Sequence, residues 1–493
     1  MSERLTQRLA ALSPEQQQAF LAKLLARRTQ TMPEEITGHV ILNSSQQGHV
    51  WFTSKHLPLM HIMPSFWEVQ TDLDPHHLES AARLLLSYHD GLRACFIQGA
   101  TEWEWEQTIL PSSALQSTPL TRRIDISHLS EDAQWEYIQT YYHQAMHLLD
   151  LFNGKLLHIA FFYRGATQSG RLLFITSHLV VDMLAIEMLI DDLSSFYRMY
   201  SEGSALHLPP KTTSIQEYAR RMSEFAHSDA GIQHIYAICE IRRAWPAPGS
   251  LDILPPDYPD GDFSWFKFGQ VVQEVNAQTT ERLLAIQAKH HIQINELLFT
   301  AYAVAFHRWT KETVIPLRIP SFGRNTPFAD IDLTHTVGNF AFYLNEVFHL
   351  PTEYSLYDAL QAVLSYWRKL PERDVSSLLL SFYRGTGTEE DVDIPQPYMA
   401  NAEINYRGQY TEEVDKTGLG LQGMKSAPEV LPYPASFSEY KSANTMKVVV
   451  MILLGKFHIT WQYGTGLYKE ATIEAFGQEM IAVLEEISHL PLP

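Results

Sequence analysis

The hydrophobic pattern divides the chain into short strands and amphipathic helices. Leucines and a phenylalanine recur at helical spacing over residues 3–30, which predicts one or two amphipathic helices. From about residue 38 to 200, short apolar runs alternate with helical patterns. Residues 201–213, SEGSALHLPPKTT, are rich in Ser, Gly and Pro and indicate a linker, after which a second mixed half begins. The alternation predicts a mixed α/β protein, and 493 residues exceed the size of a usual single core, so we expect two lobes.

One segment stands out, RLLFITSHLVVDMLAIEMLIDDLSSFY at residues 171–197. An apolar strand leads to His178, Asp182 follows four residues later, and a long amphipathic helix comes next. A histidine between a strand and a helix start is a common way to place a proton-transfer group in a cleft. Asp182 follows a strand that we expect to be buried, so its charge requires a partner.

The spacing alone is not specific. His128 and Asp132 repeat it in HLSED, a polar stretch before a predicted helix, where the helix dipole favours Asp132 in the first turn. The pair at His178 and Asp182 therefore has two interpretations at this point, a proton-transfer site and a structural pair.

The second half predicts two helices over residues 278–311 and then a strand, VIPLRIPS, that enters a Gly-Arg turn. Residues 383–440 contain many Gly, Pro and acidic positions and indicate loops. Near the end, TMKVVVMILLGKFHITWQY predicts a strand and TIEAFGQEMIAVLEEI a helix. The apolar run at residues 448–454 is far too short to span a bilayer.

Charge and composition exclude several function classes. The formal net charge of −19 argues against a nucleic-acid partner and against an anionic membrane surface. Two cysteines are too few for a disulfide framework or a thiolate metal site, and the polar N-terminal segment does not resemble a signal peptide. We expect a soluble, cytoplasmic monomer. His143 and His147 have a spacing that can chelate zinc, but no third ligand accompanies them, so we expect no metal site.

Several short motifs occur in one order along the chain. They are SSQQGHVWF (44–52), HDGLRACF (89–96), SHLVVDM (177–183), SFGRN (321–325) with VGNF (337–340), and INYRGQY (404–410). Together they resemble the condensation domains of nonribosomal peptide synthetases, which belong to the chloramphenicol-acetyltransferase-like acyltransferases. The resemblance covers the chain from roughly residue 38 to its end.

The resemblance implies an α/β fold of two chloramphenicol-acetyltransferase-like lobes. They would form a V-shaped pseudo-dimer with the active site at their junction. The implied parts are an N-terminal helical linker or docking segment (1–37), an N-terminal lobe (38–205) and a C-terminal lobe (206–493). A floor loop near 321–336, containing Gly323 and Arg324, would cross from the second lobe to the first. A latch within about 405–440 would do the same.

The family's functional residues have matches in this chain. His178 would accept the proton of the acceptor group, or hold that group by a hydrogen bond. Asp182 would position the site with Arg93 as its ion-pair partner, because a charge-assisted pair compensates for burial of the carboxylate. The backbone N–H of Met183, at the start of the following helix, would help to stabilise a tetrahedral oxyanion.

Three positions depart from the family pattern. Ser177 stands where the family has its first motif histidine, which mostly supports the site, so we expect activity to survive. Met183 replaces a glycine; its side chain either narrows a substrate tunnel or, as an apolar residue at a helix start, packs under the helix. Phe342 replaces an asparagine.

The resemblance implies an acyltransferase of nonribosomal peptide or hybrid polyketide biosynthesis. It would join a thioester-bound acyl donor to an amine or hydroxyl acceptor, giving an amide or an ester. Donor and acceptor would arrive on the phosphopantetheine arms of carrier proteins, and we expect no bound cofactor.

Three alternatives remain. An epimerisation domain would need a glutamate just before the Gly-Arg turn, where Pro320 stands. A coenzyme A-dependent acyltransferase would carry Asp-Phe-Gly-Trp-Gly late in the chain, whereas DFSWF lies at 262–266, before the helices of the second lobe. A non-catalytic recruitment module would keep the fold and lose the chemistry. The intact His178, Asp182 and Arg93 argue against that alternative.

Overall fold

The computed structural model describes residues 35–492, apart from several short segments. The segments not described are 44, 48, 51–58, 60, 70–71, 102–103, 247–253, 262–266, 371, 385–394, 396–399, 411–423 and 433–444. The predicted helices over residues 3–30 and the DFSWF segment therefore lie outside the described residues.

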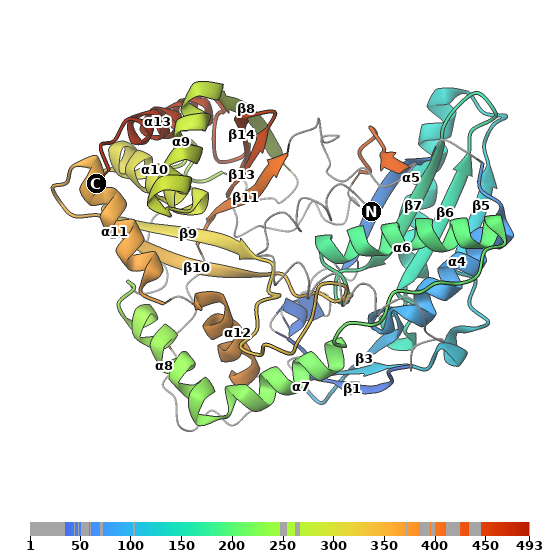
Figure 1. Ribbon diagram of the computed structural model, residues 1–493. Coiled ribbons are helices and arrows are strands. Elements are labelled where there is room, and N and C mark those ends of the chain that lie inside the picture. Colours follow the sequence, from blue (N-terminus) through green and yellow to red (C-terminus); the bar gives the residue numbers. More distant parts are fainter. Residues whose placement is uncertain are drawn as a thin grey trace.

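A five-stranded sheet organises the N-terminal part (Figure 1). In spatial order, its strands are β12 (Met424–Ser426), β2 (Ile62–Val69), β7 (Gly170–Ser177), β6 (Leu157–Tyr163) and β5 (Thr121–Asp125). Helices α4 (Pro75–Tyr88) and α6 (Met183–Glu202) share one hydrophobic cluster with β7, and α5 (Glu131–Ala145) shares another. The two clusters take alternate residues of β7, such as Phe174 and Ile175, so both faces of the strand are covered. This burial explains the unbroken apolar run before His178.

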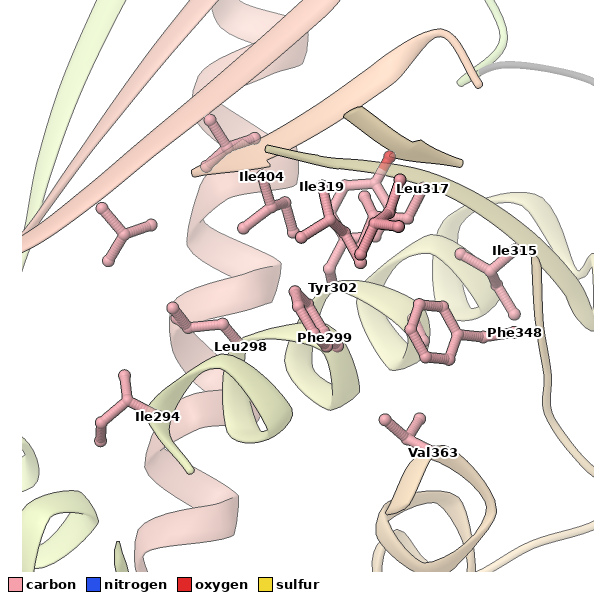
Figure 2. Close-up of a cluster of buried hydrophobic side chains, with 14 of the residues drawn as sticks. Ile294, Leu298, Phe299, Tyr302, Ile315, Leu317, Ile319, Phe348, Val363 and Ile404 are labelled. Atoms are coloured by element: carbon pink, nitrogen blue, oxygen red, sulfur yellow. The ribbon is translucent and has the colours of Figure 1, made fainter. Parts of the chain in front are cut away.

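A six-stranded sheet organises the other part. In spatial order, its strands are β10 (Phe342–His349), β9 (Val314–Ser321), β11 (Ala402–Tyr410), β13 (Met446–Leu453), β14 (Lys456–Gly464) and β8 (Phe268–Val275). Figure 2 shows Phe299 and Tyr302 of α10 (Ile294–Thr310) beside Leu317 and Ile319 of β9, within one hydrophobic cluster. This cluster is the core of the second part.

The remaining described elements complete these two parts. The further helices are α7 (Ile215–Ala226), α8 (Asp229–Arg243), α9 (Ala277–His290), α11 (Leu356–Arg368), α12 (Arg373–Arg384) and α13 (Glu470–Ser488). A small antiparallel sheet has the order β1 (Gly38–Val40), β4 (Trp105–Ile109) and β3 (Ala94–Gln98). Within the described ranges, no helix combines the length and hydropathy that a bilayer crossing needs.

Two segments cross from the second part to the first. The floor loop, residues 322–341 between β9 and β10, reaches the start of α6 through an ion pair of Arg324 with Asp182. The latch, residues 424–432, begins with β12, which pairs antiparallel with β2. Just beyond β12, Glu429 forms an ion pair with Arg171 at 2.8 Å. The latch lies within the range that the resemblance implied, whereas the floor loop extends to residue 341, beyond the implied end near 336.

Most of the predicted elements are confirmed. Helices α9 and α10 and strand β9 occupy their predicted stretches, and residues 204–214 form no helix or strand. Two predictions differ from the structure. The region predicted as loops contains β11, and the predicted terminal strand is the hairpin of β13 and β14. Leu454 and Gly455 join this hairpin with φ of 49° and 78°, as a two-residue type I′ turn requires.

Candidate functional site

His178 lies immediately after β7, in the loop that leads to α6. Its backbone N–H donates to the His61 carbonyl at 2.6 Å, which extends the pairing of β7 with β2. Its side-chain Nδ1 lies 2.8 Å from the Val181 carbonyl oxygen. Because a carbonyl only accepts, Nδ1 carries the proton and Nε2 carries the lone pair. No described residue forms a hydrogen bond with Nε2, so the lone pair of this nitrogen is not used by that part of the chain.

The surroundings of His178 favour its neutral form. Burial lowers the pKa of this imidazole below its usual value, against the opposing effect of the Val181 hydrogen bond. The His49 ring packs edge-on against it, with ring centroids 4.5 Å apart. Burial and the neighbouring His178 lower the pKa of His49 to about 3. Two uncharged imidazoles therefore lie side by side at neutral pH.

Asp182 is the N-cap residue of α6 and only 2% exposed. Its Oδ1 accepts from the Ala185 backbone N–H at 2.8 Å, and its Oδ2 accepts from the Phe340 backbone N–H at 3.2 Å. Arg324 donates to both oxygens, at 3.2 and 3.3 Å. The carboxylate is thus saturated by donors from α6 and the floor loop, while His178 Nδ1 bonds elsewhere. The geometry supports the expected structural role of Asp182.

The predicted ion pair between Arg93 and Asp182 is wrong. Arg93 ends a 3₁₀ turn after α4, is fully buried, and donates to Asp90 Oδ1 at 2.7 Å. Its other hydrogen bonds go to four backbone carbonyls, those of Ile36, Leu86, Ser87 and Leu110. These bonds hold the guanidinium at the junction of α4 with β3. Arg324, which sequence reasoning assigned only to the floor, is the partner of Asp182.

Gly323 and Arg324 shape the floor loop at this contact. Gly323 has φ of +63°, and a Cβ there would overlap the Phe340 carbonyl, so only glycine fits. Arg324 Nη1 donates to the carbonyls of Leu333 and Thr336, both at 2.9 Å. The guanidinium also lies over the Phe340 ring, 4.4 Å from its centroid. Arg324 therefore links two parts of the floor loop to each other and links the loop to α6.

The departures from the family pattern have structural consequences. Ser177 is fully buried; its Oγ accepts from the Leu179 N–H at 3.2 Å and contacts His61 Nδ1 at 3.1 Å, so the shorter side chain braces the loop. The interpretation that the Met183 side chain packs under its helix is wrong, because that residue is 53% exposed. Phe342 is buried as the first residue of β10.

Sequence reasoning missed the amides that brace the His178 loop. Asn339 Nδ2 donates to the His178 carbonyl at 2.6 Å, and Asn43 Nδ2 donates to the Asn339 carbonyl at 2.7 Å. Gln46 Nε2 donates to the Leu179 carbonyl at 2.8 Å. Gln46 and Asn339 lie inside the recognised motifs, so their amide side chains were the available signal.

Comparisons with solved structures agree with this fold. The epimerization domain from the third module of tyrocidine synthetase B superposes with a TM-score of 0.74 at 20% identity, covering 93% of this chain and 98% of that one. The first condensation domain of the calcium-dependent antibiotic synthetase, in complex with a substrate analogue, gives a TM-score of 0.62 at 18% identity, covering 92% and 97%. These likenesses confirm the predicted α/β fold.

Sequence comparisons identify the family. One of the proteins that make up the linear gramicidin synthase of Brevibacillus parabrevis is 28% identical over 466 residues, which are 92% of this chain and 6% of that protein. Chondramide synthase cmdD of Chondromyces crocatus is 29% identical over 415 residues, 84% of this chain and 10% of that protein. The chain thus spans a tenth or less of these relatives. The family model for the condensation domain matches residues 36–492, and the chain belongs to the condensation-domain family.

Proposed function

We propose that this domain transfers an acyl group from a carrier-bound thioester to an amine or hydroxyl acceptor, forming an amide or ester. The observation that carries the proposal is the state of His178, a neutral imidazole whose Nε2 lone pair has no described partner. The acceptor N–H or O–H donates to this nitrogen. As the acceptor attacks the thioester carbonyl, its proton passes to Nε2. The carbon–sulfur bond then breaks, and the leaving thiolate recovers that proton.

Asp182 holds the geometry in this scheme and does not relay protons. Its oxygens are occupied by Arg324 and by the backbone amides of Ala185 and Phe340. The tautomer of His178 is set by the Val181 carbonyl, a different arrangement from a Ser-His-Asp triad.

The start of α6 supplies the oxyanion donor in our proposal. Met183 is the first helical residue, where a backbone N–H has no intrahelical acceptor. The Asp182 side chain caps the Ala185 N–H. The Met183 N–H, at the positive end of the helix dipole, therefore remains to stabilise a negatively charged tetrahedral intermediate.

The partners in this proposal are donor and acceptor carrier proteins that present substrates on phosphopantetheine arms. The support is the set of relatives, which are peptide synthases or parts of them. We expect the domain to act as a monomer in the cytoplasm.

The test uses an acyl-loaded carrier, an added nucleophile, and intact-mass spectrometry of the carrier before and after incubation. Wild type should transfer the acyl group, His178→Ala should lose transfer, and His147→Ala, at an exposed position outside the site, should match wild type. Equal yields in all three would leave the non-catalytic recruitment module. Running the reaction in D₂O and determining the configuration of the α-carbon checks for epimerisation, since deuterium at an inverted α-carbon would require a second acid or base, which Pro320 does not supply.

A further inference from the structure

Two histidines converge on one carboxylate away from the His178 site. Asp192 lies on α6, ten residues after Asp182, which corresponds to about 15 Å along a helix. His89 Nε2 lies 2.7 Å from Asp192 Oδ2, and His335 Nε2 lies 2.9 Å from the same oxygen. These three atoms lie within 4.8 Å of one another. Nothing in the acyl-transfer mechanism uses them.

The three side chains come from separate segments. His89 follows α4, Asp192 belongs to α6, and His335 belongs to the floor loop. His89 and Asp192 are 4% and 7% exposed, and the side chain of His335 is 28% exposed. A cavity of about 30 Å³ adjoins them, lined by His89 and His335. That volume is sufficient for a water molecule.

We propose that His89, Asp192 and His335 form a site for a divalent transition-metal ion, with zinc as the ion that fits best. Two imidazole nitrogens and one carboxylate oxygen are ligand types that zinc takes, and a water in the adjoining cavity would complete a tetrahedron.

The observed distances define the movement that binding requires. Ligand atoms of a tetrahedral zinc site are about 3.3 Å apart, so the contacts of 2.7 and 2.9 Å must lengthen by about half an ångström. His335 is the partly exposed member, so the floor loop is the segment that can move. On binding, each imidazole would coordinate through Nε2 and carry its proton on Nδ1.

Such an ion would clamp the floor loop to α4 and α6. The same loop carries Arg324 and Asn339, which contact Asp182 and the His178 carbonyl. Since an ion that binds only the folded state stabilises it, zinc would raise the melting temperature and fix the position of the floor loop. The role is structural, because the ion does not contact His178.

The pair singled out by spacing, His143 and His147, is the rival metal site. His143 belongs to α5, whereas His147 lies in the 3₁₀ turn that follows it. Within the described residues, this pair joins no group of three metal-binding side chains. A variant at His147 is therefore a matched control for the proposed site.

The experiment measures metal binding by the full chain without an affinity tag. Chelator-treated protein is titrated with Co²⁺ and, separately, Zn²⁺, with absorption spectra, metal analysis and melting temperature as readouts. Wild type should bind one equivalent, show the visible bands of tetrahedral cobalt and melt at a higher temperature with either ion. His335→Gln should lose all three effects, and His147→Gln should retain them.

Two results would overturn the proposal. Wild-type protein that binds no stoichiometric ion would show that the three residues form only a hydrogen-bonded clasp. Undiminished binding by a folded His335→Gln variant, checked by circular dichroism, would place any ion elsewhere. If His335→Gln does not fold, the wild-type spectrum decides, since tetrahedral cobalt bands that persist in His147→Gln support the site and their absence rejects it.

Discussion

Arg324 donates hydrogen bonds to both carboxylate oxygens of Asp182, across 142 positions of sequence. The pair joins the floor loop to the start of α6, and Asp182 follows His178 by four residues in the chain. The Asp182 side chain is 3% exposed and that of Arg324 is 13% exposed, so water compensates neither charge well. The position of the floor loop and the capping of α6 therefore depend on the same contact.

Removing one partner of this ion pair should lower the free energy of unfolding more than removing both. Arg324→Met leaves a buried carboxylate without its counter-charge, and we expect the free energy of unfolding to fall by about 3 kcal/mol. Asp182→Asn combined with Arg324→Met should recover part of that loss, as a double-mutant cycle in urea would show. Arg220→Met is the matched control, because its ion pairs with Glu217 and Glu224 are exposed to solvent and contribute little to stability. If the losses of unfolding free energy in the two single variants simply add in the double variant, Asp182 and Arg324 are not energetically coupled.

The difference between sequence and structure at this pair has a physical reason. His178 and Asp182 could be predicted because a strand, a loop and a helix place them locally. The partner of Asp182 could not, because ion pairing between distant segments depends on how two sheets pack. The resemblance implied Arg93 as that partner, but the backbone carbonyls that Arg93 binds instead cannot be read from the sequence. The hairpin at Leu454 was missed because a leucine with positive φ hides the turn.

Substitution of Gly323 should separate backbone strain from steric overlap. Gly323→Ala introduces both, since φ is +63° and the Cβ would meet the Phe340 carbonyl. Gly455→Ala introduces only the strain, because φ is +78° and nothing lies within 4 Å. We expect Gly455→Ala to cost about 1 kcal/mol and Gly323→Ala about 3 kcal/mol or more. Only Gly323→Ala should also reduce acyl transfer. Equal losses of unfolding free energy for the two variants in urea denaturation would contradict the steric overlap at Gly323.

Acid should destabilise the protein through buried neutral histidines. Burial lowers the pKa of His61 from 6.5 to about 4, so the unfolded chain binds this proton first as the pH falls. Stability is therefore lost between about pH 6.5 and 4, by up to about 3 kcal/mol for this group. His61→Asn keeps a donor toward Ser177 and removes the titration. The loss of unfolding free energy in His61→Asn relative to wild type should shrink by about 2 kcal/mol between pH 7 and 5.

A cost of His61→Asn that does not change between pH 7 and 5 would show that His61 is not held neutral in the folded protein.

The pH dependence of transfer should report the proton acceptor. The pKa of His178 lies below 6.5, so the base is active at neutral pH and the rate falls only as the pH drops through that lowered value. A hydroxyl acceptor isolates this limb, since an amine acceptor adds its own protonation at higher pH. The measurement is kcat/KM against pH with a preloaded carrier. An acid limb with a midpoint above pH 6.5 would contradict a buried neutral base.

The oxyanion role of Met183 can be tested by removing one backbone N–H. Proline suits the first position of a helix, and the extended backbone of Asp182, with φ of −110° and ψ of −178°, suits a residue before proline. Met183→Pro should leave the free energy of unfolding nearly unchanged and lower kcat by about 100-fold or more. Met183→Ala keeps the N–H and loses the same exposed side chain, so its kcat should remain close to that of wild type. Equal kcat values for the two variants would move the oxyanion donor away from this amide, whereas a loss confined to the proline variant would assign it.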